Sequence, residues 1–201
     1  MAGFKVENGV IAPMLAENID TDVIMPKQFL KGIDRKGLDQ GIFFDQRFLA
    51  GGVPNPEFVL NRTEWTAAKF LAVGPNFGCG SSREHAVWGL KQLGVRALIG
   101  TSFAGIFFDN SQRNGLLLIE LPVADFERVA AVANEGEQEI AIDLPKQTIR
   151  LAAGEEVSFE IETLRKQALL QGGDAIAHTL RLTPHIRTFE ARHFRENPWL
   201  S

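Results

Sequence analysis

The chain has 201 residues, of which 45% are hydrophobic and 23% charged, a globular composition that excludes a wholly disordered chain. Its 21 Lys and Arg against 25 Asp and Glu give a net charge of −4. That charge disfavours sequence-independent nucleic-acid binding, which depends on basic surfaces. Cys79 is the single cysteine, so the chain cannot by itself supply the thiolates of an iron–sulfur cluster or a cysteine-rich zinc site.

The sequence also gives an expectation for the cellular compartment of the protein. No basic region followed by an apolar run opens the chain, and charge or proline interrupts every apolar stretch well before about 20 residues. We therefore expect no secretory signal and no membrane-spanning helix. With one cysteine no internal disulfide can form, which favours a reducing compartment. These features predict a cytoplasmic protein with no membrane partner.

The first third of the chain is expected to contain a hairpin followed by loops. Apolar residues 4–6 and 10–14, separated by Glu7-Asn8-Gly9, indicate two strands joined by a turn. Residues 18–22 are dense in short polar side chains that bond their own backbone. Residues 34–56 lack a sustained period and predict a long ordered loop with at most one short helix.

The middle of the chain alternates strands and helices. Strands are expected at residues 69–73, 95–99 and 116–121, with helices at 83–93 and 103–113. Ser81 or Ser82 is expected to cap the first helix and Gly94 to end it. Because parallel strands need crossover helices of this kind, the order predicts an α/β layer with parallel pairing.

The pattern changes after Pro122. We expect a helix to residue 134, short strands at 140–142, 148–151 and 156–161, and a mostly helical segment over 162–194. No linker separates two domains, so residues 1–201 are expected to form one domain. Its core covers about 1–125, and an appendage of short strands and helices covers about 126–201. His178, His185 and His193 fall on different helical faces, which favours a solvated or partner-facing helix over a metal site.

One loop of the expected α/β layer carries the clearest sign of chemistry. It reads Gly78-Cys79-Gly80-Ser81-Ser82-Arg83-Glu84-His85 and lies between a strand and a helix. Glycines let a ligand approach the backbone, and the amides of a helix start together with Arg83 attract an anion. The residues predict a cradle for a carboxylate or phosphate and do not specify a reaction. A helix cap with turn glycines explains them as well, and caps are common.

The run from Asn76 to Ala86 resembles the signature of the 3-isopropylmalate dehydratase small-subunit family, which is similar to the swivelling domain of aconitase. Two more stretches agree in the same order, residues 18–30 and Asn114-Gly115-Leu116-Leu117. Asn55-Pro56-Glu57-Phe58 and the chain length fit the bacterial form, so the resemblance covers essentially the whole chain. It implies an α/β, aconitase swivel-like (β/β/α) domain with a partly parallel central sheet and a helical C-terminal appendage.

The resemblance also implies a reaction. It is a hydro-lyase that interconverts 2-isopropylmalate and 3-isopropylmalate through 2-isopropylmaleate in leucine biosynthesis. Such a small subunit is active only with a large subunit. No cofactor and no metal are expected on this chain, and a [4Fe–4S] cluster acting as a Lewis acid is expected on the large subunit. The expected partners are that subunit and a small dicarboxylate substrate, with no nucleic acid.

The family pattern assigns roles to residues of this chain. Ser82 is expected to take the proton from carbon, Ser81 to be an oxyanion or substrate contact, and Arg83 to bind a substrate carboxylate. The remaining expected site residues are substrate-binding Gly80, Arg35, Ile33 and Leu38, and supporting Asp20, Thr21, Asp22 and His85. Ile33 and Leu38 are expected to meet an isopropyl group.

Other interpretations remain open for the substrate, for the roles of two site residues and for the role of the protein. Arg35 also fits a solvated basic turn with Lys31 and Lys36, and Asp22 fits a self-bonded Asx turn. Val87, Ser111 and Leu118 depart from residues common in the family, which leaves the subfamily open. A related dehydratase of the citraconate/2-methylmalate or homoaconitate type, or a non-catalytic interaction module, therefore remains an alternative.

Overall fold

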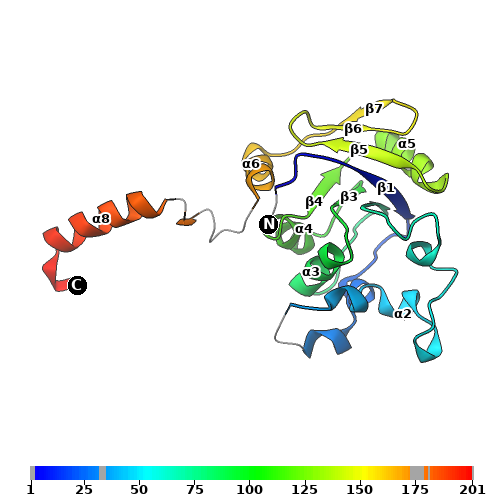
Figure 1. Cartoon of the computed structure of the whole chain (residues 1–201), viewed down its shortest axis with the longest axis horizontal. Helices are drawn as coiled ribbons and strands as arrows, with labels where there is room; N and C mark the ends of the chain where they lie inside the picture. The colour runs from blue at the N-terminus through cyan, green and yellow to red at the C-terminus, as the bar shows by residue number, and fades with distance from the viewer. Residues whose placement is uncertain (1–2, 32–34, 173–178, 181, 201) are drawn as a thin grey trace.

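A seven-stranded mixed sheet organises the computed structural model, which describes residues 3–31, 35–172, 179–180 and 182–200. The strand order is β4-β3-β2-β1-β5-β6-β7, with the long β1 in the centre (Figure 1). The strands are β1 (Val6–Met14), β2 (Phe70–Val73), β3 (Ala97–Gly100), β4 (Leu117–Glu120), β5 (Glu139–Asp143), β6 (Thr148–Arg150) and β7 (Glu156–Ser158).

Helices connect the strands and close the chain. The α-helices are α1 (Thr21–Ile24), α2 (Phe44–Arg47), α3 (Glu84–Gln92), α4 (Gly105–Arg113), α5 (Val123–Asn134), α6 (Thr163–Gln171) and α8 (Thr183–Glu196). The 3-10 turns are η1 (Lys27–Lys31), η2 (Leu38–Gly41), η3 (Ala50–Gly52), η4 (Val59–Asn61) and η5 (Pro198–Leu200). Among these described elements, none is both long enough and apolar enough to cross a bilayer.

The expected parallel layer is confirmed. β1, β2, β3 and β4 pair in parallel, and α3 and α4 make the crossovers from β2 to β3 and from β3 to β4. The partly parallel α/β class and the helical C-terminal segment are therefore as expected. The three strands after Pro122 are also present, and they extend the same sheet in antiparallel fashion from β1. The division near residue 125 stays a prediction.

The expected N-terminal hairpin is wrong. β1 runs unbroken from Val6 to Met14, and Asn8 and Gly9 pair with Ala141 and Ile140 of β5. A two-residue Asn-Gly turn needs positive φ, which neither residue adopts. Gly9 serves a close approach instead, because a Cβ there would lie 2.8 Å from Cδ of Lys69. The partner strand lies about 130 residues further along, beyond the reach of any local pattern.

Successive side chains of the buried strands point to opposite faces of the sheet, so the sheet has a hydrophobic core on each face. In β2, Leu71 and Val73 face one core, while Phe70 and Ala72 face the other. The first core lies under α3, α4 and the segment that leads from β1 to β2. The second is covered by α5 and α6, through residues such as Val129 and Leu169. Strands buried on both faces read as continuous apolar runs, which explains why the sequence revealed them.

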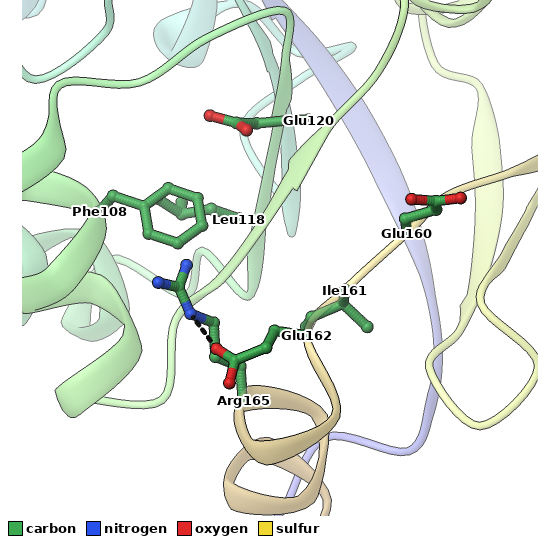
Figure 2. Close-up of a pocket in the computed structure, with 7 residues that line it drawn as sticks. All are labelled: Phe108, Leu118, Glu120, Glu160, Ile161, Glu162 and Arg165. Atoms are coloured by element: carbon green, nitrogen blue, oxygen red, sulfur yellow. Dashed lines mark ion pairs between the residues drawn. The ribbon is translucent and has the colours of Figure 1, made fainter.

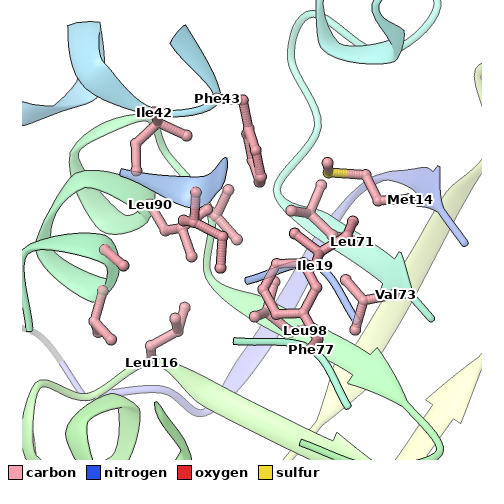
Figure 3. Close-up of a cluster of buried hydrophobic side chains, with 14 of the residues drawn as sticks. Met14, Ile19, Ile42, Phe43, Leu71, Val73, Phe77, Leu90, Leu98 and Leu116 are labelled. Carbon is pink, nitrogen blue, oxygen red and sulfur yellow. The ribbon is translucent and has the colours of Figure 1, made fainter. Parts of the chain in front are cut away.

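The segment between β1 and β2 contains more regular structure than expected. Instead of at most one short helix, residues 35–56 form η2, α2 and η3. Each has three or four residues, below the length at which helical periodicity is visible in a sequence. Phe43 anchors the segment, because it is fully buried and reaches the first core in Figure 3.

The last helix stands apart from the sheet. In Figure 1, α8 extends away from the strands and the other helices. It has no buried residue, and it exposes Ile186, Phe189 and Phe194. The sequence interpretation of this helix as solvated or partner-facing stays a prediction, and His178 lies outside the described residues.

Candidate active site

Two loops meet at one edge of the sheet, and together they hold most of the expected site residues. The first loop, residues 18–22, follows β1, and the second, residues 76–83, follows β2. Because β1 and β2 are parallel, both loops leave the sheet at the carboxyl ends of these strands, where ligands bind in open α/β sheets. We call them the Asp loop and the serine loop.

Backbone hydrogen bonds join the two loops. Thr21 N donates to Cys79 O at 2.8 Å, and Gly78 N donates to Ile19 O at 2.8 Å. Beneath them, the side chains of Ile19 and Phe77 enter the first core, as Figure 3 shows. The loops are thus anchored from below and tied to each other, so the site is built on a fixed base.

Thr21 fixes the backbone of Ser81. Its Oγ1 donates to Ser81 O and accepts from Ser81 N, both at 3.0 Å, and the residue is buried. Asp20 acts locally, because its Oδ1 accepts from Val23 N at 2.8 Å and caps α1. Both expected supporting residues therefore shape the site rather than face solvent.

Arg83 and Asp22 form an ion pair at the base of the serine loop. Arg83 is 9% exposed, and its Nη1 lies 2.6 Å from Asp22 Oδ1 and donates to Met25 O at 3.2 Å. The hydrogen bond from Arg83 holds the pKa of Asp22 below its ordinary value. The Asx turn considered for Asp22 as an alternative is not formed, because among the described residues no backbone N–H donates to its carboxylate and Ile24 N donates to Asp20 O. A guanidinium has five N–H donors, and the contacts with Asp22 and Met25 do not use all of them. The expected contact of Arg83 with a substrate carboxylate stays a prediction.

The expectation that a serine caps the following helix is wrong. α3 begins at Glu84, its N-cap is Arg83, and no side chain caps it. The chain is held by Thr21 and Arg83 at this point, so the helix starts two residues after Ser82. Both serines are exposed, and within the described residues the Ser82 hydroxyl makes no hydrogen bond. The helix end is as expected, with Gly94 at φ 104 and its N donating to Lys91 O.

Two glycines give the serine loop its shape. Gly78 has φ 80, and a Cβ there would lie 2.2 Å from the ring of Phe107. Gly80 has φ 90, with Asp20 and Thr21 about a van der Waals contact away from its missing Cβ. Gly80 is exposed beside the serines, in keeping with its expected place against a ligand.

A second group of expected residues lies along α3. The guanidinium carbon of exposed Arg35 is 3.9 Å from the centroid of the Trp88 ring, and the His85 ring is 4.8 Å from that of Trp88. Leu38 is 5% exposed and packs in the first core, so its expected contact with a substrate remains a prediction. Ile33 lies outside the described residues.

Sequence reasoning assigned no role to Trp88 or Gln92, and none to Asn114 beyond its motif. Gln92 bonds the backbone of residues 35 and 38, and Asn114 bonds Trp88 and Glu84. The positions 85, 88 and 92 follow the spacing of one helical face, which is the signal that could have grouped them.

No group of three or more His, Cys, Asp or Glu side chains in the described part of the chain is placed to hold a metal ion. Cys79 is a free thiol whose Sγ donates to Asn18 O at 3.4 Å. One thiol does not fit an iron–sulfur cluster on this chain.

A separate cavity of about 320 Å³ lies beside the edge strand β4 (Figure 2). Arg165 pairs there with Glu162 at 2.9 Å and lies 4.6 Å from the ring centroid of Phe108. None of the expected site residues lines it.

Comparisons with known proteins agree with this geometry. A family model described as the aconitase C-terminal domain matches residues 1–124, and a second, LeuD_N, matches residues 128–163. A protein of Salmonella typhimurium strain LT2 named 3-isopropylmalate dehydratase small subunit 2 is 58% identical over 201 residues, covering 100% of this chain and 96% of that relative. Small subunit 1 of Mannheimia succiniciproducens is 55% identical, covering 100% of this chain and 99% of that relative.

A solved structure extends the likeness to the fold. The crystal structure of 3-isopropylmalate dehydratase (leuD) from Methanocaldococcus jannaschii superposes with a TM-score of 0.68. It is 25% identical, and the match covers 92% of this chain and 99% of that chain.

Proposed function

This chain belongs to the 3-isopropylmalate dehydratase small-subunit family, within the aconitase C-terminal domain family, and from that membership we propose how it contributes to catalysis. Enzymes of this family are hydro-lyases of leucine biosynthesis. The observation that carries the proposal is the exposed pair Ser81 and Ser82, held at the start of α3 by the Asp loop.

Ser82 is the proposed base. As an alkoxide, its Oγ takes the proton from the carbon next to the one that carries the hydroxyl. The electron pair of that C–H bond forms the alkene, and the hydroxyl leaves from the neighbouring carbon. In the return step hydroxide adds to the carbon that lost its proton, and the proton on Ser82 Oγ passes to the carbon that lost the hydroxyl. This completes the isomerisation and restores the alkoxide.

A serine alkoxide needs stabilisation, which three features of this site supply. The first-turn amides of α3 and its dipole lie two residues away, and Arg83, the residue next to Ser82, adds guanidinium N–H donors there although it is paired with Asp22. Asp22 holds Arg83 in place, and Thr21 holds the Ser81 backbone. Ser81 is exposed beside Ser82 and is proposed as the contact for a substrate oxygen.

The rest of the active site is proposed to come from the large subunit. Relatives named small subunits imply such a partner. We place a [4Fe–4S] cluster on it, because this chain offers one cysteine, and when bound there the cluster would supply Lewis-acid chemistry to the leaving hydroxyl. A reducing cytoplasmic setting fits such a complex.

Substrate choice is proposed to lie with the segment before α2. Arg35 is an exposed cation over the Trp88 ring, and we propose that it contacts the dicarboxylate bound in the complex. The proposed substrate is isopropylmalate, a small dicarboxylate, and this proposal rests on the membership of the family.

The first test measures formation of 2-isopropylmaleate from 3-isopropylmalate under anaerobic conditions. The chain is assayed alone and mixed with the large subunit from the same source. Turnover is expected only in the mixture. Activity of the chain alone would contradict the half-enzyme proposal, and a mixture that turns over only citraconate would contradict the substrate.

A second test separates catalysis from assembly. Ser82→Ala is expected to reduce kcat at least about 1000-fold while leaving the Kd for the large subunit unchanged. Ser158→Ala, at an exposed position on β7, is the matched control and is expected to keep full activity. Equal loss of binding and turnover in Ser82→Ala would assign the serine to the interface instead.

A further inference from the structure

A chain of three contacts links exposed Arg35 to the interior. Arg35 lies over the Trp88 ring, and Trp88 Nε1 donates to Asn114 Oδ1 at 2.9 Å. Asn114 is 8% exposed, and its Nδ2 donates to Glu84 Oε1 at 2.6 Å and to Asn110 O at 2.9 Å. Because the amide of Asn114 uses its oxygen and both hydrogens, it holds the indole ring in one orientation.

Gln92 fastens the backbone on which Arg35 sits. Its Oε1 accepts from Leu38 N at 2.9 Å, and its Nε2 donates to Arg35 O. One side-chain amide thus ties both ends of residues 35–38 to α3. The burial of Leu38 in the first core secures the same segment from below.

The contacts to residues 35–38 lie on one face of α3, the helix that follows the serines. Trp88 and Gln92 make these contacts, and His85, whose ring contacts that of Trp88, lies on the same face one turn earlier. The three are spaced i, i+3 and i+7, and the helix rises about 1.5 Å per residue, so this face extends over about 10 Å. The N-terminus of the same helix lies two residues after Ser82. A single rigid element therefore sets the separation between the proposed base and Arg35.

We propose that Trp88, Gln92 and Asn114 are positioning residues that hold Arg35 at a fixed place relative to Ser82 and so determine which substrate side group is accepted. This inference rests on the proposed function of Ser82 and Arg35. It also gives a role to the Asn114-Gly115 motif, which lies in the turn between α4 and β4 rather than in the Asp loop or the serine loop.

The kinetic consequence follows from where these residues act. Trp88 and Gln92 contact Arg35 and its backbone, and Asn114 acts through Trp88. The serine loop, in contrast, is held by Thr21 and by the pair of Asp22 with Arg83. Loss of Trp88 or Gln92 is therefore expected to raise KM and to leave kcat nearly unchanged. A residue needed only for folding would lower the amount of active enzyme without changing KM.

The first experiment assays the complex with the large subunit. Trp88→Leu is expected to raise KM for 3-isopropylmalate about fivefold with kcat within about twofold, the size of a lost cation–π contact. Trp88→Phe keeps an aromatic face and is expected to fall between Trp88→Leu and wild type. Trp199→Leu is the matched control, because Trp199 is 75% exposed on η5, and it is expected to behave as wild type.

A double-mutant cycle tests whether Trp88 acts through Arg35. In an Arg35→Ala background, Trp88→Leu is expected to have no further effect on KM. The ratio of kcat/KM for 3-isopropylmalate to that for citraconate hydration is expected to fall in both single variants. Additive effects on KM, or an unchanged ratio, would overturn the inference.

A measurement independent of turnover follows the three indole N–H signals by NMR on the full chain. Arg35→Ala, Gln92→Met and Asn114→Asp are each expected to shift the Trp88 signal and to leave those of Trp65 and Trp199 in place. An unmoved Trp88 signal would overturn the inference. A wild-type complex that does not turn over isopropylmalate would instead overturn the proposed function, whatever the NMR result.

Discussion

Gly80 holds a backbone conformation that L side chains rarely adopt, and it does so directly before the two serines. Its φ is 90, and its missing Cβ would lie 3.4 Å from both Asp20 and Thr21. The space alone would tolerate an alanine. The conformation would not, because an L residue in this region costs about 1–2 kcal/mol.

A substitution of Gly80 by alanine has a matched control at Gly136, a glycine of almost equal φ. Gly136 has φ 93 and open space around the missing Cβ. Both Gly80→Ala and Gly136→Ala are expected to lower the free energy of unfolding in urea by about 1–2 kcal/mol. Only Gly80→Ala is expected to lower kcat, since its backbone carries the serines. Full activity in Gly80→Ala would show that the loop conformation is not needed for turnover.

The burial of Lys91 can be tested by the pH dependence of the free energy of unfolding. Desolvation lowers the pKa of Lys91 to about 8 from its ordinary value of 10.5. Between these values the unfolded chain binds the proton and the folded chain does not, so the free energy of unfolding should rise with pH across this window. Urea unfolding at pH 7.5 and 9.5 is expected to show a larger rise for wild type than for Lys91→Met. Equal rises would assign the pH dependence to other groups.

At the scale of elements, α3 packs closely at Gly89 against the ends of two side chains, which must shift to admit a Cβ. A Cβ there would lie 2.6 Å from Cδ1 of Ile42 and from Cε of Met25. The close fit brings the helix onto the segment that carries Arg35. It also explains why a glycine, which costs about 1 kcal/mol in a helix interior, is found there.

Two glycine-to-alanine changes in helices are expected to have opposite signs. Gly89→Ala gains about 1 kcal/mol of helix propensity and loses about 1–3 kcal/mol to overpacking, so a net destabilisation is expected. Gly105→Ala lies at the exposed start of α4 with nothing near the missing Cβ, and a small stabilisation is expected. Thermal unfolding of both variants measures the difference. Stabilisation by Gly89→Ala would mean that Ile42 and Met25 yield at low cost.

At the scale of the whole molecule, the C-terminal elements differ in what they contribute to stability. Leu169 of α6 is 5% exposed in the second core, and its carbonyl accepts from Phe4 N at 2.9 Å. α8, by contrast, has no buried residue. The sheet should therefore depend on α6 and be nearly indifferent to α8.

Two truncations test this difference. A chain ending at Gly172 is expected to keep its Tm within about 2 °C of the full chain, because none of the described residues beyond 172 belongs to either core. A chain ending at Glu162 loses Leu169, worth about 1.5–3 kcal/mol, and its Tm is expected to fall by about 5–10 °C. A large fall in the first truncation would show that α8 packs on the sheet domain.

The sequence by itself determined the parallel half of the sheet, the crossover helices and the presence of the serine loop. Strands buried on both faces are continuous apolar runs such as Phe70–Val73, and Gly94 ends α3 by a local conformation. The three motifs carried the family without any structure. Each of these signals is contained in a short stretch of the chain.

Only the tertiary structure decided the features that depend on distant partners. Residues 139–143 of β5 turn the expected hairpin into one strand, and α3 starts at Glu84 without the expected serine cap, after a loop whose Ser81 backbone is bonded by Thr21. The contact of Arg35 with Trp88 joins residues 53 positions apart. Hydrogen bonds and ring contacts of this range leave no local periodicity, since chain spacing says nothing about which loops leave the same edge of a sheet.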